Sequence, residues 1–527
     1  MQLEDLIDSR IGVHDDNQFE VKLDYTIDAT ARRGRYVVET YFFVPRSLGL
    51  DAHTYGREQF YGDLQSYIRF KTPTVSLRAL VDEANEGSPL LRMRERMPAL
   101  GDDQVVDLDG RLGHEVRLFG CILRVGVRDQ VRGLCERLES LGGKAEAHPL
   151  LVRDIDRLAL RLAADVGEVL AKFRSLRPDF VHPRRAAWIQ DLYAFADEYV
   201  SLSVEESFTR FIATLDDEDE EVADACAAAR ARLVERVSAE QAHRVSARYP
   251  SALDEGRMLL HRKSALKKLI SSVLFLDMTR EGEGRRIANI GAGIAAAVAM
   301  LFSTIAAIWS QNRYGINSYP FVVALVISYV FKDRIKEWLR TYFNRQFSRW
   351  LWDFSVTIRD PENDAVVGRC REVVSFADTK SVPRAVLDAR HADATSTLEP
   401  RCKPEVVIKH VKEVTLHGRK IAKTHGRLLD VKDIVRVNVS SMLTRMDDPV
   451  QHIERFDGDV VRLVPCDKAY HLNVVMALRA ASGERSYERF RVILNKAGIQ
   501  ALQEVGHQTI VQPRPWPSTT VAAAPAE

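Results

Sequence analysis

Short motifs that could support catalysis are few in this sequence, and each lacks a part that its chemistry requires. His114 and Glu115 begin the pattern of a zinc-binding helix, but Val-Arg-Leu follows and the second histidine is absent. Gly291, Gly293 and Ala296 have the spacing of a dinucleotide-binding loop, which needs a preceding strand in a soluble βαβ unit. Here these residues lie inside a long apolar run, so we discard that interpretation.

Other enzyme signatures are also missing. The sequence contains no phosphate-binding P-loop, no GxSxG elbow, no HExxH helix and no CxxC pair. We therefore predict no catalytic residue, no metal ligand and no cofactor. An enzyme whose site is assembled from distant residues stays open as an alternative. The six cysteines are scattered, which favours free thiols in a reducing compartment, and the N-terminal residues do not form a secretory signal.

Two charged segments could bind ions. The acidic run Asp216–Glu221 lacks the glycine turn of a calcium loop, and a solvated helix start explains it. Between Arg401 and Arg436, ten Lys or Arg residues meet four acids and three histidines. On a strand His410 and His417 point to opposite faces, which argues against a shared metal. This segment predicts either an anion or nucleic-acid surface, or a solvated β edge facing an anionic bilayer.

Two apolar runs in the middle of the chain dominate the organisation. Ile287–Trp309 contains no charged residue and no histidine, and as a helix it reaches roughly 34 Å, enough to cross a bilayer. Ile316–Phe331 follows and reaches only about 24 Å, so it must recruit Tyr314 and Gly315 or thin the bilayer. We predict spans over about 287–309 and 314–331; a re-entrant second segment is the alternative.

The charges beside these runs predict the topology. Lys and Arg flank both outer ends, whereas the connection between the runs carries only Arg313. Because Lys and Arg accumulate on the cytoplasmic side, we expect a multi-pass protein of a bacterial inner membrane with both termini cytoplasmic. The flanking cations are Arg280, Arg285, Arg286, Lys332, Arg334, Lys336 and Arg340.

The first run also carries small residues at four-residue spacing, which lets another helix approach closely. They pack either against the second span or against a second copy of the chain, and they are Gly291, Ala295, Ala299 and Ser303. After the second run, residues 332–354 form a basic, aromatic, amphipathic helix. It either lies in the headgroup region or packs on a cytoplasmic domain. Its candidate lipid-contacting residues are Lys332, Arg334, Lys336, Arg340, Arg345 and Arg349.

The flanking parts differ in hydrophobic period. In residues 1–103, Phe19–Ile27 and Tyr36–Val44 alternate as strands, and the short turn between them predicts an antiparallel hairpin. Residues 104–284 have helical periodicity, first over Leu108–Leu141 and last over Leu253–Met278. Residues 355–510 return to the strand period, and 511–527 are Pro- and Ala-rich, which predicts a disordered tail.

The sequence therefore predicts an α+β multidomain membrane protein. It has a mixed N-terminal region, a cytoplasmic helical domain (104–284), a two-helix transmembrane hairpin (285–354), and a mostly antiparallel β-sandwich or small barrel. The expected function is a membrane-anchored scaffold, sensor or regulator without enzymatic activity. An oligomeric membrane effector or pore is the alternative, although only Asn289, Ser303 and Thr304 are polar in the first span. Expected partners are anionic lipids and a second copy; nearly balanced charge does not favour nucleic acid.

Overall fold

The computed structural model describes most of the chain, which divides into two compact units. The described residues are 10–96, 105–141, 149–182, 185–252, 256–281, 283–315, 318–347, 352–361, 364–392, 405–425, 430–458, 460–481, 483–504 and 509–511. One unit, the β unit, combines Met1–Arg69 with Leu276–Glu527. The other, the helical unit, is Phe70–Phe275. The predicted tail 511–527 lies outside the described residues except for Val511.

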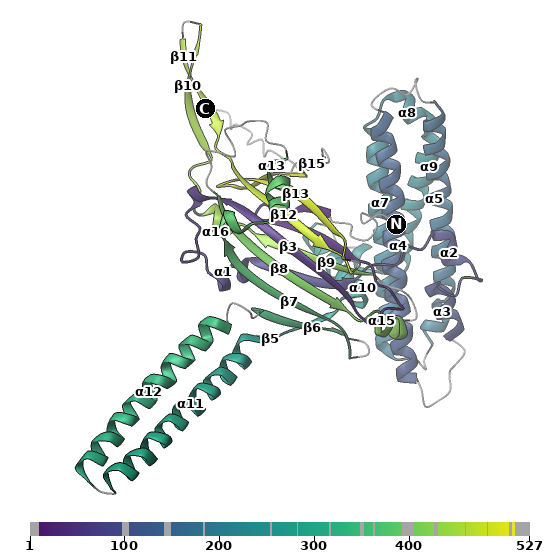
Figure 1. Cartoon of the computed structure of the whole chain (residues 1–527). Helices are drawn as coiled ribbons and strands as arrows, with labels where there is room; N and C mark the ends of the chain where they lie inside the picture. The colour runs from purple at the N-terminus through teal and green to yellow at the C-terminus, as the bar shows by residue number, and fades with distance from the viewer. Residues whose placement is uncertain are drawn as a thin grey trace, which may run out of the picture. The chain divides into compact units, whose positions relative to one another are not determined.

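The β unit contains a four-stranded sheet, a nine-stranded sheet and a two-stranded ribbon (Figure 1). The four-stranded sheet has the order β1 (Arg10–Asp15), β2 (Gln18–Tyr25), β9 (Val431–Asn438), β4 (Leu64–Phe70). The ribbon pairs β10 (Val450–Asp457) with β11 (Val460–Asp467). The nine-stranded sheet has the order β15 (Thr509–Val511), β14 (Gly498–Glu504), β13 (Arg485–Asn495), β12 (Tyr470–Arg479), β3 (Gly34–Pro45), β8 (Glu405–Leu416), β7 (Ala365–Ala377), β6 (Phe354–Asp360), β5 (Asp277–Glu281).

Strands from the two ends of the chain share these sheets. The predicted strands near the N-terminus are confirmed as β2 and β3, but the predicted hairpin between them is wrong. β2 pairs with β1 and β9, whereas β3 pairs with β8 and β12. The reason is that alternation determines which residues face the core but not which strand supplies the hydrogen-bonding partner.

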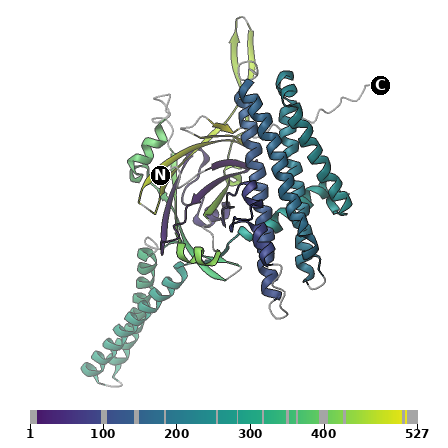
Figure 2. The same cartoon turned by 90° about the vertical axis from the view of Figure 1, so that its right-hand side faces the viewer.

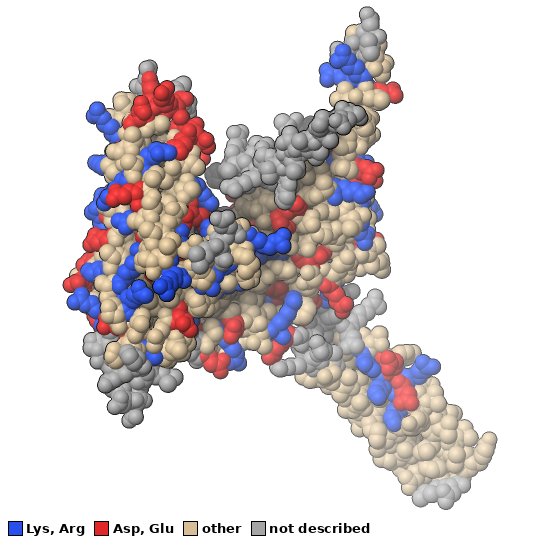
Figure 3. All heavy atoms as spheres, turned by 180° about the vertical axis from the view of Figure 1, so that it is seen from behind, with Lys and Arg blue, Asp and Glu red and all other residues tan. Residues whose placement is uncertain are grey.

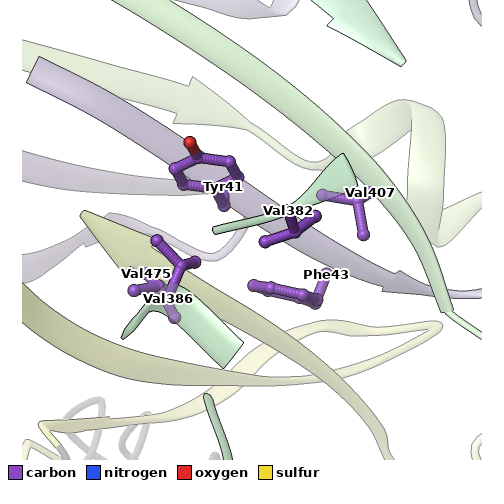
Figure 4. Close-up of a cluster of buried hydrophobic side chains, with 6 residues drawn as sticks. All are labelled: Tyr41, Phe43, Val382, Val386, Val407 and Val475. Carbon is purple, nitrogen blue, oxygen red and sulfur yellow. The ribbon is translucent and has the colours of Figure 1, made fainter. Parts of the chain in front are cut away.

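The two sheets enclose a common interior. Inward residues of β2 and β9, such as Val21 and Val437, line the same small space as Val38, Val474 and Phe490 from the nine-stranded sheet. On the outer face of the nine-stranded sheet, α13 (Arg384–His391) covers an apolar cluster (Figure 4). That cluster is Tyr41, Phe43, Val382, Val386, Val407 and Val475.

The helical unit is built on long helices that run side by side in both Figure 1 and Figure 2. They are α4 (Val105–Leu141), α5 (Pro149–Ser175), α7 (Ala187–Asp216) and α9 (Ala227–Ser246), with α10 (Arg257–Ser271) against α4 and α7. The predicted helix over Leu108–Leu141 is confirmed. Gly120 lets α10 approach α4, because a Cβ there would lie 2.8 Å from Ile270 Cγ2.

The last predicted helix of this region ends earlier than expected. The helical pattern continues to Met278, but α10 ends at Ser271 and Met278 lies in β5. β5 pairs with β6, which follows about 70 residues later, so its strand conformation depends on a distant partner. Between them lie α11 (Glu283–Tyr314) and α12 (Tyr319–Phe347), two long helices packed on each other.

Candidate functional site

The helical hairpin formed by α11 and α12 is inserted into a β-hairpin. Glu281 ends β5 and pairs with Ser355, the second residue of β6. The chain therefore leaves the nine-stranded sheet and returns to it at neighbouring positions. We call this place the hairpin root. Both ends of the two-helix insertion are thus held at the same edge of the sheet.

Small residues form the contact between the two helices. Ala295 and Ala299 are buried, Ser303 is half-buried, and a Cβ added to Gly291 would lie 3.4 Å from Phe343 Cβ on α12. The predicted small-residue stripe thus faces α12 of the same chain. Because none of these side chains is larger than that of serine, the two helix backbones can approach closely.

Much of the hairpin surface away from this contact is apolar and exposed. Outward residues such as Ile294, Leu301, Ile305, Val326 and Phe331 are all at least 40% exposed. Within the described residues, one helix segment, Asn289–Tyr314, is long and apolar enough to cross a membrane, and only 17% of its most apolar 18-residue window is buried. The core helix of a soluble domain would be mostly buried. α12 does not reach the same apolar threshold.

The predicted basic segment is a direct continuation of the second apolar run, because α12 is unbroken from Tyr319 to Phe347. Arg334, Lys336 and Arg340 are exposed, and Lys332 lies over the ring of Tyr329 with its Nζ 4.4 Å from the centroid. On the face seen in Figure 3, charged side chains gather toward the root end of the hairpin. Arg345 belongs to α12, but its side chain is outside the described part; Arg349 lies outside it entirely.

A buried ionic cluster lies between the two sheets. It is level with the hairpin root, because Glu372 pairs with both Lys412 on β8 and Phe354 on β6. Lys412 on β8 donates to Asp433 on β9, with an Nζ to Oδ2 distance of 2.7 Å, and also to Ser66 on β4 at 2.5 Å. Tyr25 on β2 donates to Asp433 Oδ2 at 3.0 Å. Four strands from both sheets therefore meet at one ion pair.

Glu372 extends this cluster toward the hairpin root. Its carboxylate lies 3.9 Å from Lys412 Nζ and 3.6 Å from His410 Nε2. Phe354, the first residue of β6, is paired with Glu372. Arg280 is on β5. Its guanidinium carbon, Cζ, lies 3.7 Å from the ring centroid of Phe354 and 4.9 Å from that of Tyr61. Arg280 at the root is therefore packed against Phe354, the residue paired with Glu372 of the cluster.

The electrostatics of the cluster favour the charged forms of Lys412 and Glu372. Burial disfavours the ammonium of Lys412, but its neighbours Asp433, Cys370 and Glu372 together outweigh burial and raise the pKa of Lys412. Burial would raise the pKa of Glu372, yet nearby His410 and Lys412 lower it to about 2. Burial also raises the pKa of the Cys370 thiol. The adjoining cavity is about 20 Å³, room for one water, so the cluster has no space for a substrate in this conformation.

The cluster corrects one sequence interpretation. The composition of Arg401–Arg436 predicts either an anion or nucleic-acid surface or a solvated β edge. For β8 this prediction is wrong, because β8 lies inside the sheet and both His410 and Lys412 are buried. The basic residues of the helix that follows, α15 (Gly418–His425), are exposed, as at Arg419 and Lys420. His410 and Lys412 share the inward face of β8 with Ile408 and Val414. Alternation alone could have placed them inward. Among the described residues, no group of three or more His, Cys, Asp or Glu side chains is arranged to hold a metal.

The helical unit contains a second buried ionic network that the sequence patterns did not reveal. Arg174 on α5 bonds Asp197 at 2.9 Å and Glu240 at 2.6 Å, and His243 bonds the other oxygen of Asp197 at 2.7 Å. Arg262 pairs with the buried Glu198 at 2.7 Å. These carboxylates are all paired, so the network joins α5, α7, α9 and α10 rather than forming a reactive site.

Comparison of the chain with known protein families, with curated proteins and with solved structures gives no match.

Proposed function

We propose that this protein is a membrane-anchored cytoplasmic scaffold or regulator without enzymatic activity. In this proposal, α11 and α12 cross the bilayer as a hairpin, and the β unit and the helical unit remain on the cytoplasmic side. The observation that carries the proposal is the exposed apolar surface of the hairpin. A continuous apolar surface of this length is unfavourable in water and favourable in a hydrocarbon core.

The hairpin root supports the same-side topology. Since Glu281 and Ser355 are paired neighbours, the chain that enters the hairpin and the chain that leaves it must lie on one face of the bilayer. The basic flanks of the two helices favour the cytoplasm for that face. Arg313 alone occupies the opposite end among the Lys and Arg residues of the hairpin.

The root end of α12 supports contact with anionic lipid. Arg334, Lys336 and Arg340 are exposed there, and so are the amphipathic rings of Trp338 and Tyr342. Aromatic and basic side chains together favour the headgroup region, where each cation contributes about 1 kcal/mol beside anionic lipids. The short apolar part of α12 is accommodated when Lys332 extends its ammonium to the interface.

Substitutions on the outward face of α11 test the membrane proposal. Leu301→Lys with Ile305→Lys introduces two charges at exposed positions without disturbing the α11–α12 contact. We expect this variant to lose membrane integration, measured as the fraction that resists alkaline extraction. The matched control is Val461→Lys with Leu463→Lys, at equally exposed positions of the β10–β11 ribbon. If the Leu301 and Ile305 variant stays integrated, or if the unaltered protein is extracted, the proposal is wrong.

A further inference from the structure

The two helices of the hairpin have different surfaces at the same level. A Cβ added to Gly291 would lie 3.4 Å from Phe343 Cβ, which fixes the register of α11 against α12. Because both helices rise about 1.5 Å per residue, residues 333–340 of α12 lie beside residues of about 294–301 on α11. Every residue in that part of α11 is apolar, and Ile294 and Leu301 are exposed. The facing part of α12, in contrast, carries charges.

Acidic and basic side chains lie together on this part of α12. We call four of its residues, Asp333, Lys336, Glu337 and Arg340, the charged stripe. All four are exposed, and none forms an ion pair with any residue that the structure describes. Figure 3 shows side chains of both signs next to each other on the hairpin. The stripe is therefore a set of two acids and two bases that have no partner within the described chain.

Neither lipid nor water suits both helices at this level. Charged side chains are costly in hydrocarbon, whereas the exposed apolar side chains of α11 are costly in water. Anionic headgroups at this depth would offer phosphates to Lys336 and Arg340, but they would repel Asp333 and Glu337. The two acids therefore favour a protein partner that brings cations to the same depth.

The two signs lie toward opposite borders of the charged stripe. Successive residues turn about 100° around a helix, which places Lys336 and Arg340 toward one border and Asp333 and Glu337 toward the other. A two-fold axis along the bilayer normal, passing beside the stripe, brings the basic border of one copy opposite the acidic border of a second copy. Both copies then use the same residues, and the acids of each face the bases of the other. The stripe is thus complementary to itself.

We propose that the protein forms a homodimer through the charged stripes of two α12 helices, in which the acids of each stripe pair with the bases of the other. This inference rests on the proposed membrane anchoring, because the bilayer holds two hairpins parallel and at the same depth. Ion pairs beside hydrocarbon are stronger than in water, since little solvent competes for the charges. Arg334, Trp338 and Tyr342 lie on the side of α12 opposite the stripe, so that side still faces the lipid in the dimer.

Charge reversal in the full-length protein tests this proposal. The acid-reversed variant carries Asp333→Lys with Glu337→Lys, and the base-reversed variant carries Lys336→Glu with Arg340→Glu. Energy transfer between donor-labelled and acceptor-labelled copies is measured over a series of protein-to-lipid ratios, in vesicles of phosphatidylcholine alone or with about one-third phosphatidylglycerol. We expect the unaltered protein to associate in both. Each variant alone should need about tenfold or more protein for the same transfer, because like charges then face each other.

Mixing the two variants provides the sharper result. A donor-labelled acid-reversed copy and an acceptor-labelled base-reversed copy have stripes of opposite sign, so their mixture should associate at least as well as the unaltered protein. The matched control is Lys468→Glu with Lys496→Glu, which reverses two cations that are exposed elsewhere on the β unit and should leave association unchanged.

Alkaline extraction of the same samples separates association from anchoring. Extraction of the unaltered protein contradicts the anchoring itself. If the unaltered protein stays integrated but monomeric, or if the mixture fails to restore association, the dimer proposal is wrong while anchoring stands. A monomer whose base-reversed variant loses integration only in the anionic vesicles would assign the stripe to headgroups and also overturn the proposal. Should a reversed variant leave the membrane when made alone, production together with the other variant should restore its integration, and failure to do so counts against the dimer.

Discussion

Lys412 and Asp433 form an ion pair of 2.7 Å that joins the nine-stranded sheet to the four-stranded sheet, and both side chains are inaccessible to solvent. A buried ion pair costs desolvation free energy for both groups, which the mutual attraction and the bonds to Ser66 and Tyr25 offset. Each of the two charges therefore depends on the other to remain buried.

Removing one partner of this pair should be far worse than removing both. Lys412→Ala leaves the Asp433 carboxylate buried without a cation and should lower the free energy of unfolding by about 3–5 kcal/mol. The double variant Lys412→Met with Asp433→Leu should recover most of that loss. Urea unfolding of the solubilised protein measures both. Lys468→Ala, which breaks the exposed pair with Asp447, is the control and should change little. Equal losses in the single and double variants would contradict this account.

Acid should destabilise the β unit through Glu372. Its folded-state pKa is about 2, below its ordinary value of 4.5, so the unfolded chain binds the proton first. The stabilisation is complete above pH 4.5 and is lost as the pH falls toward 2. Glu372→Gln should make the urea midpoint less dependent on pH over that window. Glu454→Gln on the exposed ribbon is the control; a parallel pH profile in the two variants would rule Glu372 out.

The contact between α11 and α12 should depend on which side of α11 is enlarged. Gly291→Leu places a side chain against Phe343 and should lower the thermal unfolding midpoint of the hairpin, at a cost of about 1–3 kcal/mol. Gly293→Leu is the matched control, since a Cβ there meets nothing within 4 Å. Circular dichroism of the protein in detergent measures the difference. Identical melting of the two variants would mean that the stripe does not mediate the contact.

Two glycines of α4 should respond in opposite directions. A Cβ at Gly120 would lie 2.8 Å from Ile270 Cγ2, so Gly120→Ala should force α10 away and destabilise the helical unit. At Gly133 a Cβ meets nothing within 4 Å, so Gly133→Ala should stabilise α4 by roughly 0.5–1 kcal/mol through helix propensity. Denaturant unfolding compares them. The same sign for both variants would contradict the packing of α4 on α10.

The local structure of this protein can be predicted from its amino-acid sequence. The apolar run of α11, the helical period of α4, and the alternation in β2, β9 and β12 each correspond to an element of the predicted type. These patterns are recognisable because they repeat within one element, where the solvent-facing and core-facing sides recur at the period of the backbone. The small residues of α11 and the cations of α12 were recognisable for the same reason.

The partners of these elements, in contrast, are known only from the folded chain. β3 pairs with β8 and β12, β5 pairs with β6 across the hairpin, and the Arg419 amide donates to the carbonyl oxygen of Ala31; no local period encodes any of these. The same holds for the partner of Lys412: alternation along β8 can place this lysine inward, but it does not identify Asp433 as the carboxylate opposite it. A charged residue at an inward position costs desolvation free energy alone and is tolerated when paired, and the pairing is a property of the tertiary structure.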